Sequence, residues 1–233
     1  MTYEQVIKKL KSMASPKNVA GMARFGIIPK SEILGISIWD LRKLKKEIGT
    51  NHQLALKLWN SGTHEARILA SFIDDPKEVT EKQLDKWVKD FDSWDIVDQV
   101  SELIAHTRYV VKKIHQWAKR DEEFIKRTAF SLIAELAWWE KKMADRDFEQ
   151  FFPIIKKAAT DERNFVRKAV NWALRNIGKR NTKLNKEAIK IAKEIQKIDD
   201  KTAKWIAADA IRELSSEKIQ KRLVVRSTAR RTG

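Results

Sequence analysis

The sequence predicts an all-α protein made of repeated helices, and three observations support this prediction. Along almost all of the 233 residues, apolar side chains recur every three or four positions, as on one face of a helix. No segment alternates apolar and polar residues between hairpin turns, so no sheet is expected. Glycine and proline number only 7 and 4, which makes turn-rich β folds and linker-like chains poor fits.

The first half of the chain is expected to form short helices between glycine and proline breaks. Leu54 and Leu58 fit one helix face, and Leu84, Val88 and Phe91 fit another. The run Thr-Glu-Lys-Gln at 80–83 fits a capping box at the start of the second of these helices. The expected breaks along the whole chain are Pro16, residues 26–29, Gly35, Gly49, Gly62, residues 74–76, Pro153 and Gly178.

The second half carries a degenerate repeat. Residues 124–129 (FIKRTA) resemble residues 165–170 (FVRKAV) at an offset of 41 residues, and residues 202–208 (TAKWIAA) give a third variant. A helical repeat of about 40 residues is typical of HEAT-like solenoids, in which helix pairs stack into a curved superhelix. An ordinary helical bundle with chance similarity is the alternative. We expect one repeat domain over residues 1–223, followed by a flexible, basic tail over residues 224–233 that lacks an apolar face.

Charge gives the first indication of a partner. Lysine and arginine number 48 against 32 aspartates and glutamates, which leaves a net charge of +16. So large an excess favours a polyanion such as nucleic acid over the alternative of a lysine-rich solvated surface. No apolar run is long enough for a transmembrane helix, and the first residues lack the apolar core of a signal peptide, so we expect a cytoplasmic protein. The absence of cysteine fits a reducing compartment and excludes thiolate chemistry.

Common catalytic and metal-binding motifs are missing from the sequence. The chain has no glycine-rich phosphate loop and no Gly-x-Ser-x-Gly nucleophile elbow. The four histidines are scattered, and His64-Glu65 lacks the second histidine of a zinc-protease helix. We therefore expect neither a metal site nor a cofactor.

One candidate site combines a tryptophan and a carboxylate. Trp94 and Asp98 stand four residues apart, on one face of an expected helix. Ser93 is expected to cap this helix and Asp95 to interact with its dipole. Asp98 stands among valines, toward the apolar side, where an unpaired carboxylate is costly. It is therefore either a functional carboxylate or one partner of a buried salt bridge to an arginine.

A second candidate tryptophan stands among cations. Trp172 belongs to the stretch 161–175, which also contains Arg163, Arg167 and Lys168. The alternative interpretation is a core tryptophan with solvated charges around it.

These segments together resemble the AlkD-type DNA alkylation repair family. The resemblance is carried by residues 94–98 (WDIVD), 124–129 and 164–172 (NFVRKAVNW), and residues 18–27, 64–67 and 205–210 agree as well. The segments follow one another in the family's order from the N-terminal helices to Leu223. The resemblance implies a stack of HEAT-like repeats whose basic concave surface holds duplex DNA.

The resemblance also implies an activity. Active members of that family are monofunctional DNA glycosylases of base excision repair, which remove positively charged N3- and N7-alkylated purines. It implies that Asp98, Trp94 and Trp172 are catalytic, and that the protein is a monomer that acts on alkylated duplex DNA at the nucleoid. The residues that it assigns to phosphate contact, or that rival this assignment, are Arg127, Lys126, Arg163, Arg167 and Lys168.

Two other functions are compatible with the sequence. One is a non-catalytic protein that binds branched or damaged DNA on the same scaffold. The other is a HEAT-like protein-interaction module, which the net charge and the set of Trp94, Asp98 and Trp172 disfavour.

Overall fold

The protein is helical throughout the part of the chain that can be described. The computed structural model describes the backbone of residues 1–229 and the side chains of residues 1–225, and within these limits it contains no strand. The predicted all-α class is therefore confirmed. The chain divides into two compact units, residues 1–111 (unit 1) and residues 112–233 (unit 2).

Unit 1 is built around one almost completely buried helix. Its helices are α1 (Tyr3–Ser12), α2 (Pro16–Arg24), α3 (Ile38–Ile48), α4 (His52–Asn60), α5 (His64–Ile73), α6 (Glu81–Trp87), the 3₁₀ turn η1 (Val88–Asp90) and α7 (Trp94–Ala105). Nine residues of α5 are buried, because α3, α4 and α7 all pack against this helix. Trp59 of α4 stacks on Trp87 of α6, with the ring centroids 3.9 Å apart.

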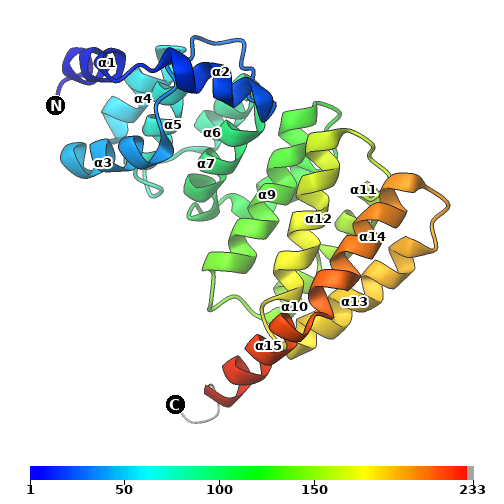
Figure 1. The fold of residues 1–233 in the computed structure, drawn as a ribbon. Coiled ribbons are helices and arrows are strands. Elements are labelled where there is room, and N and C mark those ends of the chain that lie inside the picture. The colour runs from blue at the N-terminus through cyan, green and yellow to red at the C-terminus, as the bar shows by residue number, and fades with distance from the viewer. Residues whose placement is uncertain (230–233) are drawn as a thin grey trace. The chain divides into compact units, whose positions relative to one another are not determined.

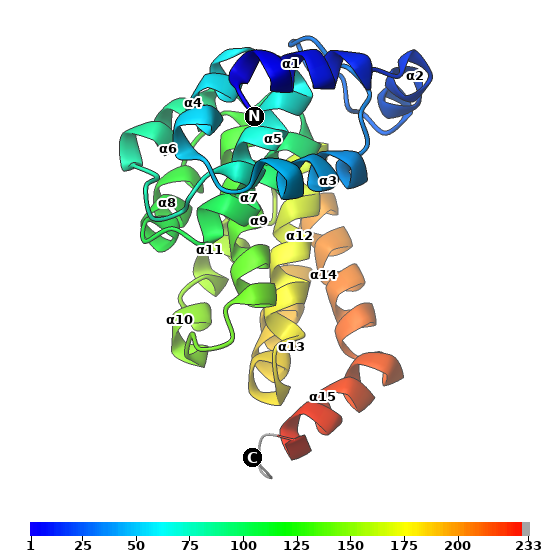
Figure 2. The ribbon, with the colours of Figure 1, turned by 90° about the vertical axis from the view of Figure 1, so that its left-hand side faces the viewer.

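Unit 2 consists of helices stacked in two layers. After α8 (Val110–Trp117), which contains the boundary between the units, its helices are α9 (Glu123–Trp139), α10 (Asp145–Glu149), α11 (Phe152–Ala158), α12 (Asn164–Gly178), α13 (Thr182–Gln196), α14 (Lys201–Leu214) and α15 (Glu217–Ala229). Helices α9, α12 and α14 lie side by side, and α11 and α13 form a second layer behind them (Figures 1 and 2).

The repeat read from the sequence corresponds to neighbouring helices. Its three copies fall on α9, α12 and α14, and α12 packs against both of the others. The equivalent rings of Phe124 and Phe165 lie 5.6 Å apart. At the other end of the same pair of helices, the amide of Asn176 donates to the carbonyl of Ala134 at 3.2 Å. The self-similarity therefore marks equivalent positions on stacked helices.

Polar side chains begin most of the helices, as expected from their capping ability. Among the helices whose N-caps are described, six besides α1 have an N-cap side chain that accepts a hydrogen bond from the first turn. These residues are Ser15, Ser37, Asn51, Thr80, Asn181 and Asp200. The predicted capping box at 80–83 is half formed. Thr80 accepts from the backbone of Gln83 at 3.1 Å, whereas the Gln83 side chain donates to Asp74 at 2.7 Å.

Two boundaries differ from the sequence expectations. The expected helix through Leu84, Val88 and Phe91 ends at Trp87 and continues as a 3₁₀ turn. The expected tail from residue 224 begins within α15, which continues to Ala229, although Val224 and Val225 are exposed. Residues 230–233 of that tail lie outside the described residues. No described helix is both long and apolar enough to cross a membrane.

Candidate functional site

Trp94 and Asp98 lie one turn apart at the beginning of α7. Both are half-buried, so Asp98 is less enclosed than its valine neighbours in the sequence suggest. The indole N–H of Trp94 donates to the backbone carbonyl of Phe25 at 3.0 Å. Because this is the only donor of an indole, the hydrogen bond holds the ring in one orientation beside the turn that carries Asp98. This link joins residues 69 positions apart, and no pattern in the sequence predicted it.

The start of α7 is held by a buried polar cluster. Asp95 accepts from the hydroxyl of Ser93 at 2.5 Å and pairs with His64 Nε2 at 2.8 Å, and His64 is completely buried. Ser93 occupies the N-cap position of α7 as expected, but its hydroxyl bonds the Asp95 carboxylate and makes no cap hydrogen bond to the backbone. Asp95 is a partner of a buried pair in addition to standing in the first turn.

Both members of this buried pair favour their charged forms. Burial alone would lower the pKa of His64, but the hydrogen bond and negative charge of Asp95 outweigh it and raise that pKa. Burial would likewise raise the pKa of Asp95, but the hydrogen bond and charge of His64 lower it. The pair therefore acts as a buried ion pair that fixes the first turn of α7, which begins with Trp94.

In unit 2, Trp172 lies half-buried on α12, and Arg127 lies inside the packing of α9 against this helix. Arg127 is only 5% exposed and donates to the carbonyl of Phe165 at 2.7 Å. The expected role of Arg127 in phosphate contact does not match this position, since the guanidinium reaches the backbone of α12. It links the two repeats to each other.

Two more of the five predicted phosphate-binding cations are engaged by one carboxylate. Asp161 contacts Lys126 at 2.8 Å and Arg163 at 2.5 Å. Burial would raise the pKa of Asp161, but the hydrogen bonds from Arg163 and Lys126 lower it to about 2. Asp161 therefore holds both side chains in place, and its single negative charge compensates one of their two positive charges at neutral pH.

The two remaining predicted cations are Arg167, which is half-buried, and Lys168. Lys168 is exposed, one turn before Trp172 on α12. The guanidinium of Arg167 lies 5.2 Å from the ring centroid of Trp205 on α14, and this ring is 41% exposed. The sequence did not single out Trp205 as a candidate, although the third copy of the repeat contains it. Lys168 and Trp172 of α12, together with the pair of Arg167 and Trp205 between α12 and α14, make up what we call the strip on α12 and α14. Combinations of cations and aromatic rings suit nucleic acid.

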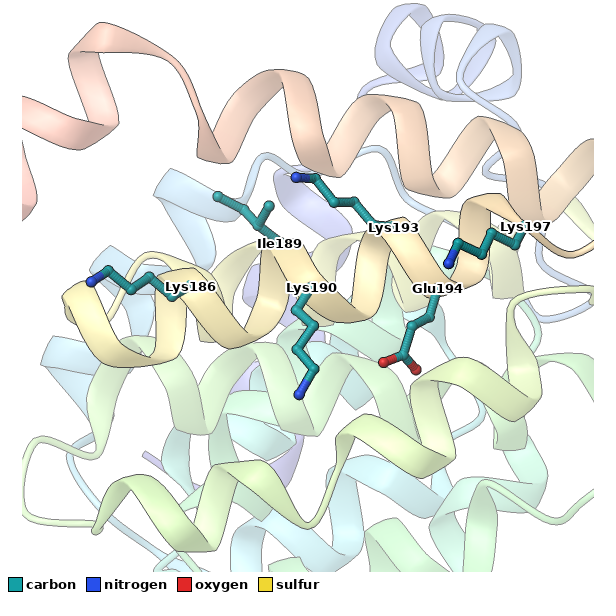
Figure 3. A pocket seen from close by; sticks show the side chains of 6 residues that line it. All are labelled: Lys186, Ile189, Lys190, Lys193, Glu194 and Lys197. Atoms are coloured by element: carbon teal, nitrogen blue, oxygen red, sulfur yellow. The ribbon is translucent and has the colours of Figure 1, made fainter.

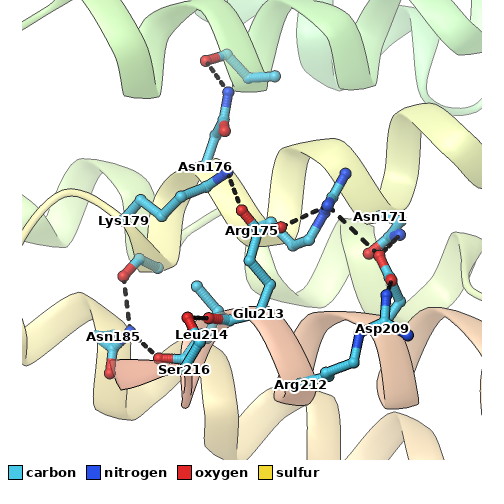
Figure 4. A network of polar contacts seen from close by, with 12 residues as sticks. Asn171, Arg175, Asn176, Lys179, Asn185, Asp209, Arg212, Glu213, Leu214 and Ser216 are labelled. Atoms are coloured by element: carbon cyan, nitrogen blue, oxygen red, sulfur yellow. Dashed lines mark hydrogen bonds and ion pairs between the residues drawn. The ribbon is translucent and has the colours of Figure 1, made fainter. Parts of the chain in front are cut away.

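A ladder of polar contacts holds α12 in register with α14 (Figure 4). Asn171 donates to Asp209 at 2.7 Å, and Lys179 donates to Glu213 at 2.9 Å, with Arg175 paired to both carboxylates. Burial acts to raise the pKa of Glu213, but the hydrogen bond from Lys179 and the nearby cations lower it. The ladder therefore fixes the backbone of α12 at Asn171, next to Trp172.

The sequence-predicted site residues are divided between the two units. Trp94 and Asp98 share one helix of unit 1, whereas Trp172 and the five cations belong to unit 2. Within residues 1–225, no group of three or more His, Asp or Glu side chains gathers as the ligands of a metal ion would.

Comparison with known proteins gives a consistent result. The model of the family described as DNA alkylation repair enzyme matches residues 6–214. The uncharacterized proteins Lmo0209 of Listeria monocytogenes and Lin0241 of Listeria innocua are each 20% identical over 202 residues, which cover 85% of this chain and 88% of theirs. The resemblance inferred from the sequence is thereby confirmed.

A solved structure supports the assignment of the fold. It belongs to a protein described as part of a new family related to the HEAT-like repeat DNA glycosylases, with affinity for branched DNA structures. The match has a TM-score of 0.75 at 17% identity and covers 91% of this chain and 95% of that one. At this identity the likeness shows a HEAT-like repeat fold.

Proposed function

The chain belongs to the family of DNA alkylation repair enzymes, and from this premise we propose that it is a DNA glycosylase for N3- and N7-alkylated purines. The observation that carries the proposal is the arrangement at the start of α7. There the ring of Trp94, fixed by its hydrogen bond to Phe25, lies one turn from the half-buried carboxylate of Asp98. The substrate proposed is duplex DNA, in keeping with the expected location at the nucleoid.

The proposed chemistry needs electrostatic stabilisation more than proton transfer. Alkylation at N3 or N7 gives the purine a full positive charge, so the base is already a good leaving group. When the N-glycosidic bond breaks, its electron pair neutralises the purine, and positive charge develops on the sugar. Water then adds to the sugar carbon and releases one proton to solvent.

Trp94, Trp172 and Asp98 have the properties that this transition state requires. An indole face attracts a cation by about 0.5–2 kcal/mol, depending on how far the cation is desolvated. The carboxylate of Asp98 stabilises the developing sugar cation and orients the attacking water, as carboxylates do in glycoside cleavage. A neutral lesion would gain little from the rings, so the site selects cationic bases.

We assign the holding of the DNA backbone to the strip on α12 and α14. Lys168 and Arg167 present charge on it, and Trp172 and Trp205 present ring surface. Arg127, Lys126 and Arg163 have a supporting role in this proposal, because they bind the backbone of α12 or the carboxylate of Asp161.

The test is release of 7-methylguanine and 3-methyladenine from methylated duplex DNA. Asp98→Asn keeps the shape of the side chain but removes its charge, and we expect release to slow by about 10²–10³-fold. Asp121→Asn removes an exposed carboxylate of unit 2 and serves as the matched control, with release unchanged. Trp172→Ala is expected to slow release of cationic bases more than release of neutral ones.

Two outcomes would contradict the proposal in different ways. If the wild-type protein saturated with methylated DNA releases no base, the enzyme assignment is wrong. If base is released and Asp98→Asn is as fast as wild type, the activity holds and the role of Asp98 is wrong.

Non-catalytic binding of branched DNA is the second candidate function. It is favoured by the likeness of the fold to the protein described as having affinity for branched DNA structures. A wild-type protein that binds a four-way junction tightly but releases no base from any methylated DNA would establish this candidate in place of the first.

A further inference from the structure

Helix α13, in the second layer of unit 2, and its C-cap residue carry a row of four exposed lysines (Figure 3). Together with Ile189 and Glu194 they line a shallow groove of about 380 Å³. The members of this lysine row are Lys186, Lys190, Lys193 and Lys197. No function assigned above uses them.

The spacing of the lysine row places its charges on one line. At 3.6 residues per turn, the four positions fall within an arc of about 60° around the helix. At 1.5 Å per residue they extend over about 16 Å along the axis. The lysine row is therefore a straight line of positive charge, about as long as a short stretch of nucleic-acid backbone.

Two carboxylates compensate only part of the charge of the lysine row. Glu194 is bound to Lys156 of α11 at 2.9 Å and also attracts Lys190 and Lys197, and Glu187 lies 3.8 Å from Lys190, a loose contact. Lys186, Lys193 and Lys197 have no ion pair among the described residues. Like charges one turn apart on a helix repel one another, so an anion bound along the row would relieve this repulsion.

The other side of α13 indicates which polyanion fits. Its apolar residues, among them Leu184, Ala188 and Ile195, are buried, and α13 packs against α12 and α14. A helix that binds a membrane surface must insert an apolar face, and α13 offers only half-buried Ile189 beside the lysines. A hydrophilic polyanion that lies on the surface, such as a DNA backbone, matches this face better than a lipid bilayer does.

We propose that the lysine row binds the phosphates of a second DNA segment while the strip on α12 and α14 holds the first. The inference rests on the proposed DNA binding by α12 and α14. The lysine row belongs to the layer behind those helices, so the two surfaces are carried by different layers of unit 2 (Figure 1). DNA that presents two duplex arms is then bound more tightly than a linear duplex of the same length.

The experiment compares binding of a four-way junction and of a linear duplex by fluorescence anisotropy. In the test variant all four lysines of the row are changed to Gln. In the control variant Lys8, Lys11, Lys45 and Lys46, four exposed lysines of unit 1, are changed to Gln, so the same charge is removed. Loss of two or more phosphate contacts should weaken junction binding by roughly tenfold or more, and should lower the salt slope by about 0.9 per contact.

The expected result is a loss of junction preference in the test variant only, with base release from linear methylated duplex unchanged. Equal effects of the two variants on the junction would overturn the lysine row as a DNA site and would leave the glycosylase proposal standing. The wild type could instead bind vesicles with anionic lipid more tightly than the junction, and the test variant could lose this binding. That result would overturn the lysine row as a DNA site in favour of a membrane site. Absence of both duplex binding and base release in the wild type is instead the failure of the proposed function. Circular dichroism checks that both variants remain folded.

Discussion

His64 and Glu65, at the beginning of α5, show how single buried polar side chains organise unit 1. The carboxylate of Glu65 is 1% exposed and accepts from the backbone of Leu34 at 2.8 Å, Gly35 at 2.6 Å and Ile36 at 3.3 Å. The loop before α3 is therefore held against α5 by hydrogen bonds to the Glu65 carboxylate. Its neighbour His64 fastens α7 to the same helix through Asp95.

Glu65→Ala should destabilise the protein strongly. It leaves three buried backbone N–H groups without their acceptor, and each unsatisfied donor costs about 1–3 kcal/mol. We expect the free energy of unfolding to fall by about 3 kcal/mol or more in urea titrations followed by circular dichroism. Glu78→Ala, which removes an exposed glutamate, should change it by no more than about 0.5 kcal/mol. Equal stability of the two variants would show that the Glu65 carboxylate does not hold the loop.

The His64–Asp95 pair predicts a particular dependence of stability on pH. The pKa of His64 is raised in the folded protein from an ordinary value of 6.5, with Glu65 and Asp92 adding negative charge nearby. Its contribution is therefore complete below pH 6.5 and is lost as the pH rises through the folded-state pKa. The pKa of Asp95 is lowered from 3.8, so its contribution is present above pH 3.8 and is lost as the pH falls through the lowered pKa.

Thermal unfolding between pH 5.5 and 8.5 measures this dependence. The wild-type melting temperature should fall as the pH rises above 6.5, and His64→Gln should be less stable at pH 6 and lack most of that decline. If the melting temperature of His64→Gln falls with pH as much as that of the wild type, other titratable groups cause the decline.

At the scale of elements, the sequence predicted the helices and their repeat but not the contacts between distant segments. Helical spacing is a local property, and the offset between residues 124–129 and 165–170 follows from equivalent packing, so both could be read without a structure. The bond from Trp94 to Phe25 and the buried position of Arg127 depend on which helices become neighbours. The residue type at one position does not tell which helices become neighbours. The sequence therefore predicted that Arg127 contacts phosphate and did not predict its hydrogen bond to Phe165.

The two helical glycines Gly21 and Gly178 predict opposite effects of the same substitution. A Cβ at Gly21 of α2 would meet no atom within 4 Å, so Gly21→Ala should raise the free energy of unfolding by up to about 1 kcal/mol. A Cβ at Gly178, at the end of α12, would come within 2.7 Å of the buried Leu214 side chain of α14. In Gly178→Ala the cost of overpacking should exceed the gain in helix propensity, so the free energy of unfolding should fall by about 1 kcal/mol. Denaturant titrations of the two variants that shift in the same direction would contradict this reading of the α12–α14 contact.

At the scale of the whole molecule, the lysines and arginines that produce the net charge of +16 are of two kinds. Some are enclosed or paired and hold the repeats together, as Arg127, Lys126 and Arg163 do in unit 2. Others, such as Lys168 and the lysine row of α13, are exposed. Composition alone predicted a polyanionic partner but could not separate these two kinds, because the difference lies in which carboxylate or carbonyl each cation meets after folding.

This distinction predicts how the salt dependence of DNA binding responds to substitution. Each phosphate contact on duplex DNA contributes about 0.9 to the slope of log affinity against log salt concentration. Changing Arg167 and Lys168 to Gln should therefore lower the slope by up to about 1.8, because both cations belong to the strip on α12 and α14. Changing Lys126 and Arg163 to Gln removes the same charge but should alter the slope less, since Asp161 holds both side chains and compensates one of their two charges. Binding of an unmodified duplex at four salt concentrations between 50 and 300 mM, about a sixfold range, gives the slopes. If the Lys126 and Arg163 variant loses as much slope as the other, the DNA lies along α9 and the loop before α12, and the strip on α12 and α14 is not the primary surface.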